Sequence, residues 1–228
     1  MLLLFPITVP VLSHAQSEEP QTATFLKTWG QQGDQPGELH FPIDIVINSQ
    51  DDIFVTDHLN DRVQKFDAEG KLLSHFPVLP NPGGIALDKQ GNLVLSHILA
   101  SGSSKHKIGD RISIYSPGGK LIRHWGQLGS EPGQFNCPGG VAVAANGNIY
   151  IADQTNHRVQ VFDPTGQFLF EWGKYGSQPG EFGGKASPNS RVGGPQFLAF
   201  DSEGNLWTTE GANCRVQQFT AEGKLLKY

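Results

Sequence analysis

Apolar and polar positions along this chain follow an order that recurs four times. Each recurrence has two short, almost continuous apolar runs, then a run in which apolar and polar residues alternate, and then a run that carries aromatic residues. Almost continuous apolar runs are typical of strands buried on both faces, whereas alternation is typical of a strand with one face near solvent. The pattern therefore predicts four strands in each recurrence, with the first two buried most deeply.

The predicted strands are short and evenly arranged. The first strands cover 43–47, 84–88, 140–144 and 197–201, and the second strands cover 52–56, 92–96, 148–152 and 205–209. The third strands cover 63–66, 112–115, 159–162 and 216–219, and the fourth strands cover 71–76, 120–125, 167–172 and 224–228. Between the third and fourth strands, the hairpins that need a positive φ have a glycine at Gly70, Gly119, Gly166 and Gly223.

The loop between the second and third strands contains a recurring Asp-x-x-Asn-x-Arg-Val motif. It is intact at Asp57–Val63 and Asp153–Val159, has Glu in place of Asp at Glu210–Val216, and is interrupted in the second copy. The central arginines, which are 49, 47 and 57 residues apart, are Arg62, Arg111, Arg158 and Arg215. Four strands in a repeat of this length indicate one blade of a β-propeller, because each unit can bury its apolar face only against its neighbours.

The sequence thus predicts an all-β propeller of four four-stranded blades over residues 23–228. Its repeats are expected at about 37–76, 81–126, 133–173 and 193–228. One further strand of the fourth type, Ala23–Gly30, precedes the first repeat. The last repeat already has a fourth strand, so this leading strand has no place in a closed four-bladed ring. A small, open array of four blades is the alternative to a larger ring.

The repeat resembles the NHL repeat. The third copy carries the matching pattern in 133–143 and 147–162, and the letters of the family name fall on Asn156, His157 and, further on, Leu169. The resemblance implies a six-bladed ring, so we expect this chain to be part of an NHL-type propeller of six blades. Because one propeller scaffold hosts many activities, the resemblance predicts the fold and not the function.

Composition and charge disfavour two classes of partner. The net charge is −5, and the chain has no basic cluster beyond Lys105–Lys107. The charge therefore disfavours RNA binding, which some NHL domains perform through a basic face, and RNA binding stays only as an alternative. No apolar run reaches about 18 residues, so no membrane span is expected.

Residues 1–22 are expected to be an apolar leader and linker. The first fifteen residues are apolar and end in Ser13-x-Ala15, which resembles a signal-peptidase site and predicts export to the periplasm or the extracellular space. Pro6 and Pro10 interrupt the run, and no basic residue precedes it. The alternative is a misplaced start, which would leave the protein cytoplasmic.

Repeat equivalence places the motif side chains at one end of a central channel. We expect this rim to bind a protein or a small-molecule ligand through Asp57, Asn60, Arg62, His97, Arg111, Asp153, Asn156, Arg158, Glu210, Asn213 and Arg215. The planar guanidinium groups would donate to anionic or peptide groups. The structural alternative is that each arginine pairs with a nearby carboxylate or with backbone carbonyls between blades.

A metal is not expected, but one set of side chains would supply its ligands. The residues that end or follow the second strands are Asp57, His97, Asp153 and Glu210, which would suit Ca²⁺ or Zn²⁺. His97 breaks the acidic pattern and opens an insertion at 97–109 that also contains His106, and a second insertion covers 183–194. A metal-dependent lyase or lactone hydrolase is therefore the alternative to a non-catalytic scaffold.

The blade motif is also distantly similar to that of peptidyl-hydroxyglycine amidating lyases. In that family, histidines after the strand-opening proline help to bind the catalytic zinc. The matching positions here hold no imidazole, because they are Ile43, Gly83, Gly139 and Gln196. Common hydrolase and zinc signatures are also absent from the sequence. The sequence leaves enzymatic activity open without favouring it.

Two sets of remaining residues have alternative interpretations. Cys137 and Cys214 fall in loops that are predicted to emerge on one face of adjacent blades, so the sequence leaves a disulfide between them open. Three strands of the fourth type end in Trp29, Trp125 and Trp172. These rings could stack on carbohydrate, but we expect aromatic residues at a fixed repeat position to fill the gaps between blades.

Overall fold

The computed structural model describes residues 24–98, 111–184 and 193–228. The predicted leader at 1–22, His106 and most of both insertions lie outside these residues. The described part is all-β apart from η1, a single turn of 3-10 helix at His58–Asn60. A search of this part for a helix long and apolar enough to cross a membrane finds none.

The described residues form four antiparallel sheets of four strands each, besides one two-stranded pair. Sheet 1 consists of β1 (Pro42–Ile47), β2 (Ile53–Asp57), β3 (Arg62–Phe66) and β4 (Leu72–Pro77). Sheet 2 consists of β5 (Pro82–Leu87), β6 (Leu93–His97), β7 (Arg111–Tyr115) and β8 (Leu121–Trp125). Sheet 3 consists of β9 (Pro138–Val143), β10 (Ile149–Asp153), β11 (Arg158–Phe162) and β12 (Phe168–Trp172). Sheet 4 consists of β15 (Leu198–Phe200), β16 (Leu206–Glu210), β17 (Arg215–Phe219) and β18 (Leu225–Lys227).

The predicted order of strands within each repeat is confirmed, and the bounds agree closely. The predicted leading strand at Ala23–Gly30 is wrong, because residues 24–30 form no strand. A small parallel pair, β13 (Tyr175–Gly176) and β14 (Phe182–Gly183), lies in the loop that leads to sheet 4. The turn glycines have the predicted positive φ, with values of 84° to 85°. Each sheet therefore forms a meander whose third-to-fourth hairpin has the geometry that its sequence predicts.

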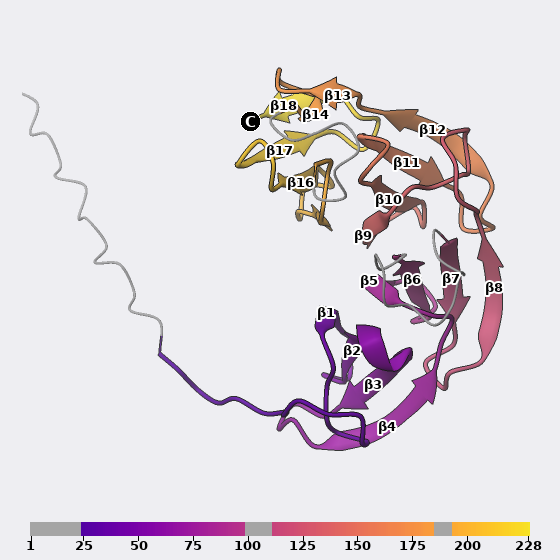
Figure 1. Cartoon of the computed structure of the whole chain (residues 1–228), viewed down its shortest axis with the longest axis vertical. Helices are drawn as coiled ribbons and strands as arrows, with labels where there is room; N and C mark the ends of the chain where they lie inside the picture. The colour runs from indigo at the N-terminus through magenta and orange to yellow at the C-terminus, as the bar shows by residue number, and fades with distance from the viewer. Residues whose placement is uncertain (1–23, 99–110, 185–192) are drawn as a thin grey trace, which may run out of the picture.

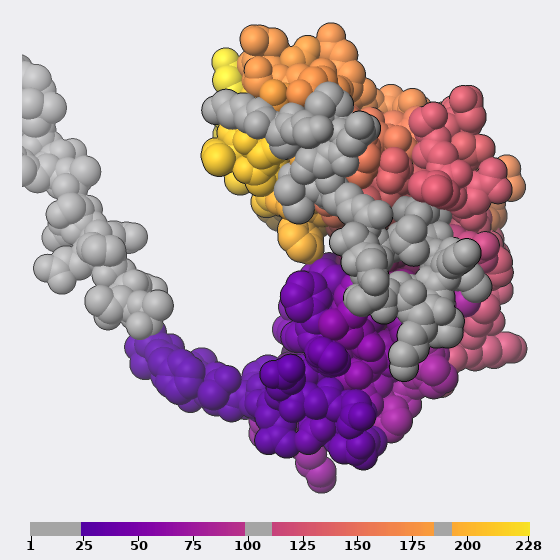
Figure 2. Space-filling view, viewed as in Figure 1, coloured from indigo at the N-terminus to yellow at the C-terminus, as the bar shows by residue number. Residues whose placement is uncertain are grey.

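The four sheets lie side by side along an arc, as Figure 1 shows. The first strands β1, β5 and β9 line the inner side of the arc, and β4, β8 and β12 lie on its outer side. Figure 2 shows the same arc as a continuous band of atoms along its outer side. Within the described residues no further sheet lies between sheets 4 and 1, so each of these two end sheets has one face without a neighbouring sheet.

Packing between neighbouring sheets explains the almost continuous apolar runs. Every residue of β2, β6 and β10 is buried, because the adjacent sheets cover both faces of these strands. At the junction of sheets 1 and 2, Phe54 and Val63 belong to one apolar cluster with Ile85. Close approach of the inner strands also requires glycine, since a Cβ on Gly140 would lie 2.6 Å from the Cα of Phe197.

The tryptophans of the outer strands fill gaps between sheets, which confirms the structural interpretation. Trp125 of sheet 2 lies against Phe162 of sheet 3, with ring centroids 5.7 Å apart. Trp172 of sheet 3 meets Phe219 of sheet 4 in the same way, at 5.8 Å. Each indole also lies under the turn glycine of the next sheet, where a Cβ would come within about 3 Å of the ring.

Candidate functional site

Each buried Asp–Arg pair of the repeat lies where the second strand meets the third. In sheet 1, Asp57 ends β2 and Arg62 begins β3, and the two residues are cross-strand partners. The Arg62 Nε donates to the Asp57 Oδ2 at 2.7 Å, and the Asp57 side chain has no exposed surface. The antiparallel register therefore brings the first and sixth residues of the motif together as a buried ion pair.

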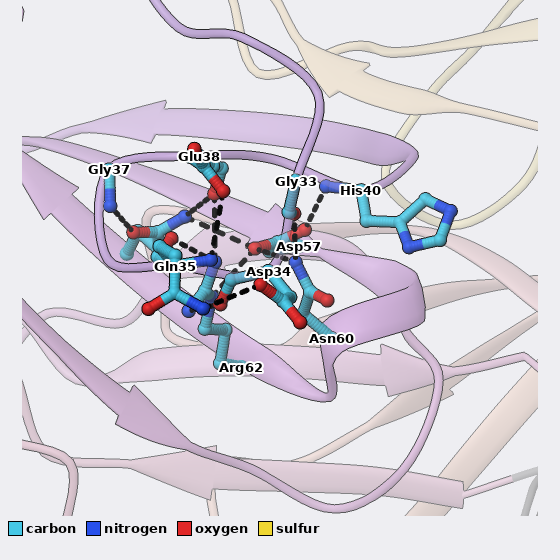
Figure 3. Close-up of polar contacts among 10 residues, drawn as sticks. Gly33, Asp34, Gln35, Gly37, Glu38, His40, Asp57, Asn60 and Arg62 are labelled. Carbon is cyan, nitrogen blue, oxygen red and sulfur yellow. Dashed lines mark hydrogen bonds and ion pairs between the residues drawn. The ribbon is translucent and has the colours of Figure 1, made fainter.

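The rest of the Arg62 guanidinium binds the backbone of the loop at 30–41. Its Nη1 donates to the carbonyl of Asp34 at 2.8 Å, and its Nη2 donates to the carbonyls of Gln35 at 2.9 Å and Glu38 at 2.8 Å. Figure 3 shows the loop curled around this guanidinium, with its carbonyls turned inward. A planar group with several donors suits this task, because one side chain satisfies several carbonyls at once.

Two amide side chains complete the contact with the loop. Asn60 Nδ2 donates to the Asp57 Oδ2 at 2.8 Å and to the carbonyl of Gly33 at 2.9 Å. Gln64 Nε2 donates to the Asp57 Oδ2 and to the carbonyl of Glu38. The Asp57 Oδ1 accepts the loop amide of His40 at 2.6 Å. The loop clamp of sheet 1 is therefore a set of four side chains, namely Asp57, Asn60, Arg62 and Gln64.

Sheets 3 and 4 contain the same loop clamp. Its members are Asp153, Asn156, Arg158 and Gln160 in sheet 3, and Glu210, Asn213, Arg215 and Gln217 in sheet 4. Arg158 Nη2 donates to two carbonyls of the loop at 126–137, each at 3.1 Å. Arg215 Nη2 donates to two carbonyls of the loop at 173–184, at 2.9 Å and 2.7 Å. Three loops are thus held by one arrangement of side chains.

Sheet 2 departs from this arrangement. His97 takes the place of the carboxylate and pairs with Arg111 across the ladder. Its Nδ1 lies 3.0 Å from the Pro80 carbonyl, which can only accept, so Nδ1 carries the proton. Its Nε2 then accepts from the Ser113 hydroxyl at 2.6 Å. Burial lowers the pKa of His97 to about 4, so the imidazole is neutral at physiological pH.

Burial also acts on the carboxylate of sheet 3. It raises the pKa of Asp153, while hydrogen bonds from the Asn136 amide, Asn156 and Arg158 oppose this shift. With the Arg158 Nε 2.9 Å away and the Asn136 amide 2.8 Å away, we conclude that the carboxylate is ionised near neutral pH. It acts there as a buried acceptor for groups of its own repeat.

In sheets 1, 3 and 4 the rim arginines therefore bind groups of the protein itself, which is the structural alternative to ligand binding. Arg62, Arg158 and Arg215 pair with a carboxylate of their own repeat and with loop carbonyls, and their Asp, Glu and Asn partners are buried or half-buried with them. Arg111 is half-buried and faces the neutral His97 instead. A ligand-binding role for these eleven side chains stays a prediction.

The residues named for a metal do not come together. Among the described residues, no three His, Cys, Asp or Glu side chains form a group that could hold an ion, so Asp57, His97, Asp153 and Glu210 remain in separate sheets. Cys137 and Cys214 are thiols and not a disulfide, with Cys137 buried and Cys214 exposed. The disulfide that the sequence left open is thus not formed.

The clamp glutamines, Gln64, Gln160 and Gln217, are functional members that the sequence analysis missed. Each has a fully buried side chain that bonds to the carboxylate of its own clamp. A signal for them exists, because glutamine follows Val directly after the motif arginine in these three copies and serine stands there in sheet 2.

The clamp interpretation predicts a cost for removing one amide. Asn60→Ala should lower the free energy of unfolding by about 1–2 kcal/mol, because it leaves the Gly33 carbonyl and one Asp57 bond unsatisfied. Urea unfolding followed by tryptophan fluorescence measures this change. Asn146→Ala, in an exposed turn, is the control. An unfolding midpoint equal to that of the unmodified chain would show that Asn60 does not hold the loop.

The fold and the loop clamps define this protein as a propeller of repeated β-sheets. Residues 135–162 match the model of the NHL repeat, which confirms the resemblance in the copy where the sequence carried it most completely. The chain therefore contains an NHL repeat at these residues. Comparison with curated protein sequences gives no match.

Solved structures support the fold. The chain is similar to a streptogramin B lyase structure, with a TM-score of 0.62 and 19% identity over 90% of this chain and 58% of that one. It is similar to virginiamycin B lyase from Staphylococcus aureus, with a TM-score of 0.58 and 16% identity over 82% of this chain and 55% of that one. It is also similar to the WD40 β-propeller domain of Doa1, with a TM-score of 0.56 and 11% identity over 81% of this chain and 53% of that one. The chain spans less than two thirds of each, and these identities establish the fold alone.

Proposed function

We propose that this protein is a non-catalytic NHL propeller scaffold that binds a protein or a small-molecule ligand through its clamped loops and the nearby channel mouth. The observation that carries this proposal is the direction of the clamp donors. In three sheets they point at the backbone of a loop, so the loop is held rigidly and its own side chains form the outer surface. Rigid loops on a repeated scaffold are common sites of binding.

The three loops present different side chains at one equivalent position. Gln32, Leu128 and Tyr175 each form a parallel bridge to a later residue of their own loop, which fixes the equivalence. Leu128 is 62% exposed and Tyr175 is 42% exposed. Two apolar side chains that stay in solvent on rigid loops favour a ligand with an apolar part, such as a protein surface.

We further propose that the four sheets are part of a six-sheet ring that functions outside the cytoplasm without a bound cofactor. The ring is supported by the two uncovered end faces and by the similarity to larger proteins of the same fold. Export is motivated by the apolar leader. The rival function is a metal-dependent lyase or lactone hydrolase, since the streptogramin B lyase structure has a similar fold.

The test compares ligand capture by two variants of the chain. Leu128→Glu combined with Tyr175→Glu should remove partners that co-purify with the tagged chain, because it places charge where apolar contact is expected. The control is Ile122→Glu, a change at a 45% exposed position on an outer strand. Equal capture by both variants would contradict the proposal. Stoichiometric Ca or Zn that disappears in Asp153→Ala would favour the rival enzyme.

A further inference from the structure

We infer that Arg111, the first residue of β7, is the centre of a binding site for an organic carboxylate, which a small acid or an acidic group of a partner protein can supply. The inference rests on the proposed binding function and names the ligand chemistry of sheet 2, which lacks the loop clamp of the other three sheets. Two observations carry it. The Arg111 guanidinium has no polar partner among the described residues, and the described part of its sheet supplies no acidic side chain to it.

Arg111 occupies the position at which the other three motif arginines are fully engaged. Arg62, Arg158 and Arg215 each bind a carboxylate through Nε and loop carbonyls through Nη, at distances of 2.7 Å to 3.1 Å. Arg111 has the same place in the ladder and is half-buried, but within the described residues its guanidinium makes no hydrogen bond and no ion pair. Because a guanidinium has five N–H donors and keeps its charge, both remain available to a ligand.

Two positions that hold acidic side chains in sheet 3 hold histidine in sheet 2. Asp153 at the end of β10 and Glu171 on β12 both pair with Arg158, each with polar atoms 2.9 Å apart. In sheet 2, His97 ends β6 and His124 lies on β8, and both His124 and Glu171 lie opposite the residue two positions after the motif arginine. An imidazole is neutral or positive, so neither histidine can neutralise a guanidinium.

The connection that precedes sheet 2 supplies no carbonyl to Arg111. Sheets 1 and 2 are joined by residues 78–81, a segment shorter than any of the three loops that bind the other arginines. The Pro80 carbonyl of this segment lies 3.0 Å from the Nδ1 of His97 and is bound there. The carbonyl oxygens that the Nη atoms receive from a loop in the other three sheets are therefore missing from this connection.

A carboxylate compensates for both deficits of Arg111. It brings the negative charge that Asp153 and Glu171 bring to Arg158, and its two oxygens match two parallel N–H donors of the guanidinium fork. An uncharged peptide could satisfy the donors through its carbonyls, but it would leave the positive charge without a counter-ion. Half-burial of Arg111 strengthens the attraction, because an ion pair that is partly removed from water is screened less than an exposed pair.

The test titrates the whole chain with acetylglycine, and binding is followed through NMR shifts of the backbone amides of β7. The neutral analogue acetylglycinamide should not bind, and Arg111→Gln should abolish binding of the acid. His124→Glu places a carboxylate where Glu171 binds Arg158, so it should weaken binding about tenfold or more by occupying Arg111 from within the chain. The matched control is His75→Glu, which makes the same change of charge at the equivalent exposed position of sheet 1 and should leave binding unchanged.

Two further probes distinguish the sources of the carboxylate. A pentapeptide with blocked ends and one central aspartate represents an acidic segment of a partner protein. Tighter binding of this peptide than of acetylglycine would support the site with a partner protein as the source. Binding of acetylglycine without binding of the peptide would support it with a small acid as the source.

Several outcomes would overturn the inference. These are the absence of any shift with acetylglycine, equal binding by the unmodified chain and Arg111→Gln, and equal weakening by His124→Glu and His75→Glu. Tighter binding of inorganic phosphate than of acetylglycine would overturn the assignment to a carboxylate. If Arg111→Gln does not fold, the two exposed histidine variants still decide the question. A chain that ignores acetylglycine but loses its partners in the variant with Leu128→Glu and Tyr175→Glu would keep the proposed scaffold function and lose only this site.

Discussion

Asp153→Ala is expected to lower the free energy of unfolding by about 3–5 kcal/mol, the range for removing one partner of a buried ion pair. The substitution removes Asp153 from the Arg158 guanidinium, which is 8% exposed and keeps only the partly exposed Glu171 carboxylate at 2.9 Å. It also removes acceptors for Asn156, Gln160 and the Asn136 amide. Guanidinium chloride unfolding measures the loss, and the loop at 126–137 should exchange its amides faster.

This variant also separates the two interpretations of the rim. A carboxylate that serves a ligand is usually dispensable for stability, so its removal would abolish binding at little structural cost. Removal of a clamp carboxylate should instead lower the free energy of unfolding markedly. Glu69→Ala, in an exposed turn, is the control for loss of one negative charge. A cost below about 1 kcal/mol for Asp153→Ala would contradict the clamp.

A double-mutant cycle sharpens the interpretation. If Asp153 acts mainly through Arg158, then Asp153→Ala combined with Arg158→Ala should cost clearly less than the sum of the two single changes, because the second removes a charge that the first left with Glu171 alone. Additive costs would show that the two side chains act independently, despite the 2.9 Å separation of their polar atoms.

The fold could be predicted because its signals are local and repeated. Apolar runs such as 149–152 have to be buried on both faces, and only a neighbouring unit can supply the second face. The turn glycines needed a positive φ wherever the hairpin occurred, and they have it. The apolar runs and the turn glycines recur in several copies, so a chance match in one copy does not decide the prediction.

The site could be predicted only in part, because a repeated polar residue does not reveal which way it points. Arg62 was correctly assigned to a recurring Asp–Arg motif, yet its donors reach backbone carbonyls 24 to 28 residues earlier in the chain. Backbone carbonyls leave no trace in the sequence. Gln64 was missed for a related reason, since in an alternating strand a polar residue is expected at the surface and this one is buried by its bonds to the clamp.

The stability of the protein should fall by about 3 kcal/mol as the pH is lowered from 6.5 to 4, through His97 alone. The pKa of this histidine is about 4 in the folded protein and 6.5 in the unfolded chain. Below pH 6.5 the unfolded chain binds a proton that the folded chain does not, so each pH unit in this window costs about 1.4 kcal/mol. The full contribution is present above pH 6.5.

The cause of this shift identifies the variant that tests it. Burial disfavours the imidazolium, and the nearby positive Arg111, together with His124, opposes protonation further. His97→Gln removes the titration, so its unfolding free energy should depend less steeply on pH between 6.5 and 4 than that of the unmodified chain. His75→Gln, at an exposed position of an outer strand, controls for loss of an imidazole. Parallel profiles for the unmodified chain and His97→Gln would show that His97 takes up its proton without unfolding sheet 2, and that Pro80 and Ser113 do not hold it neutral.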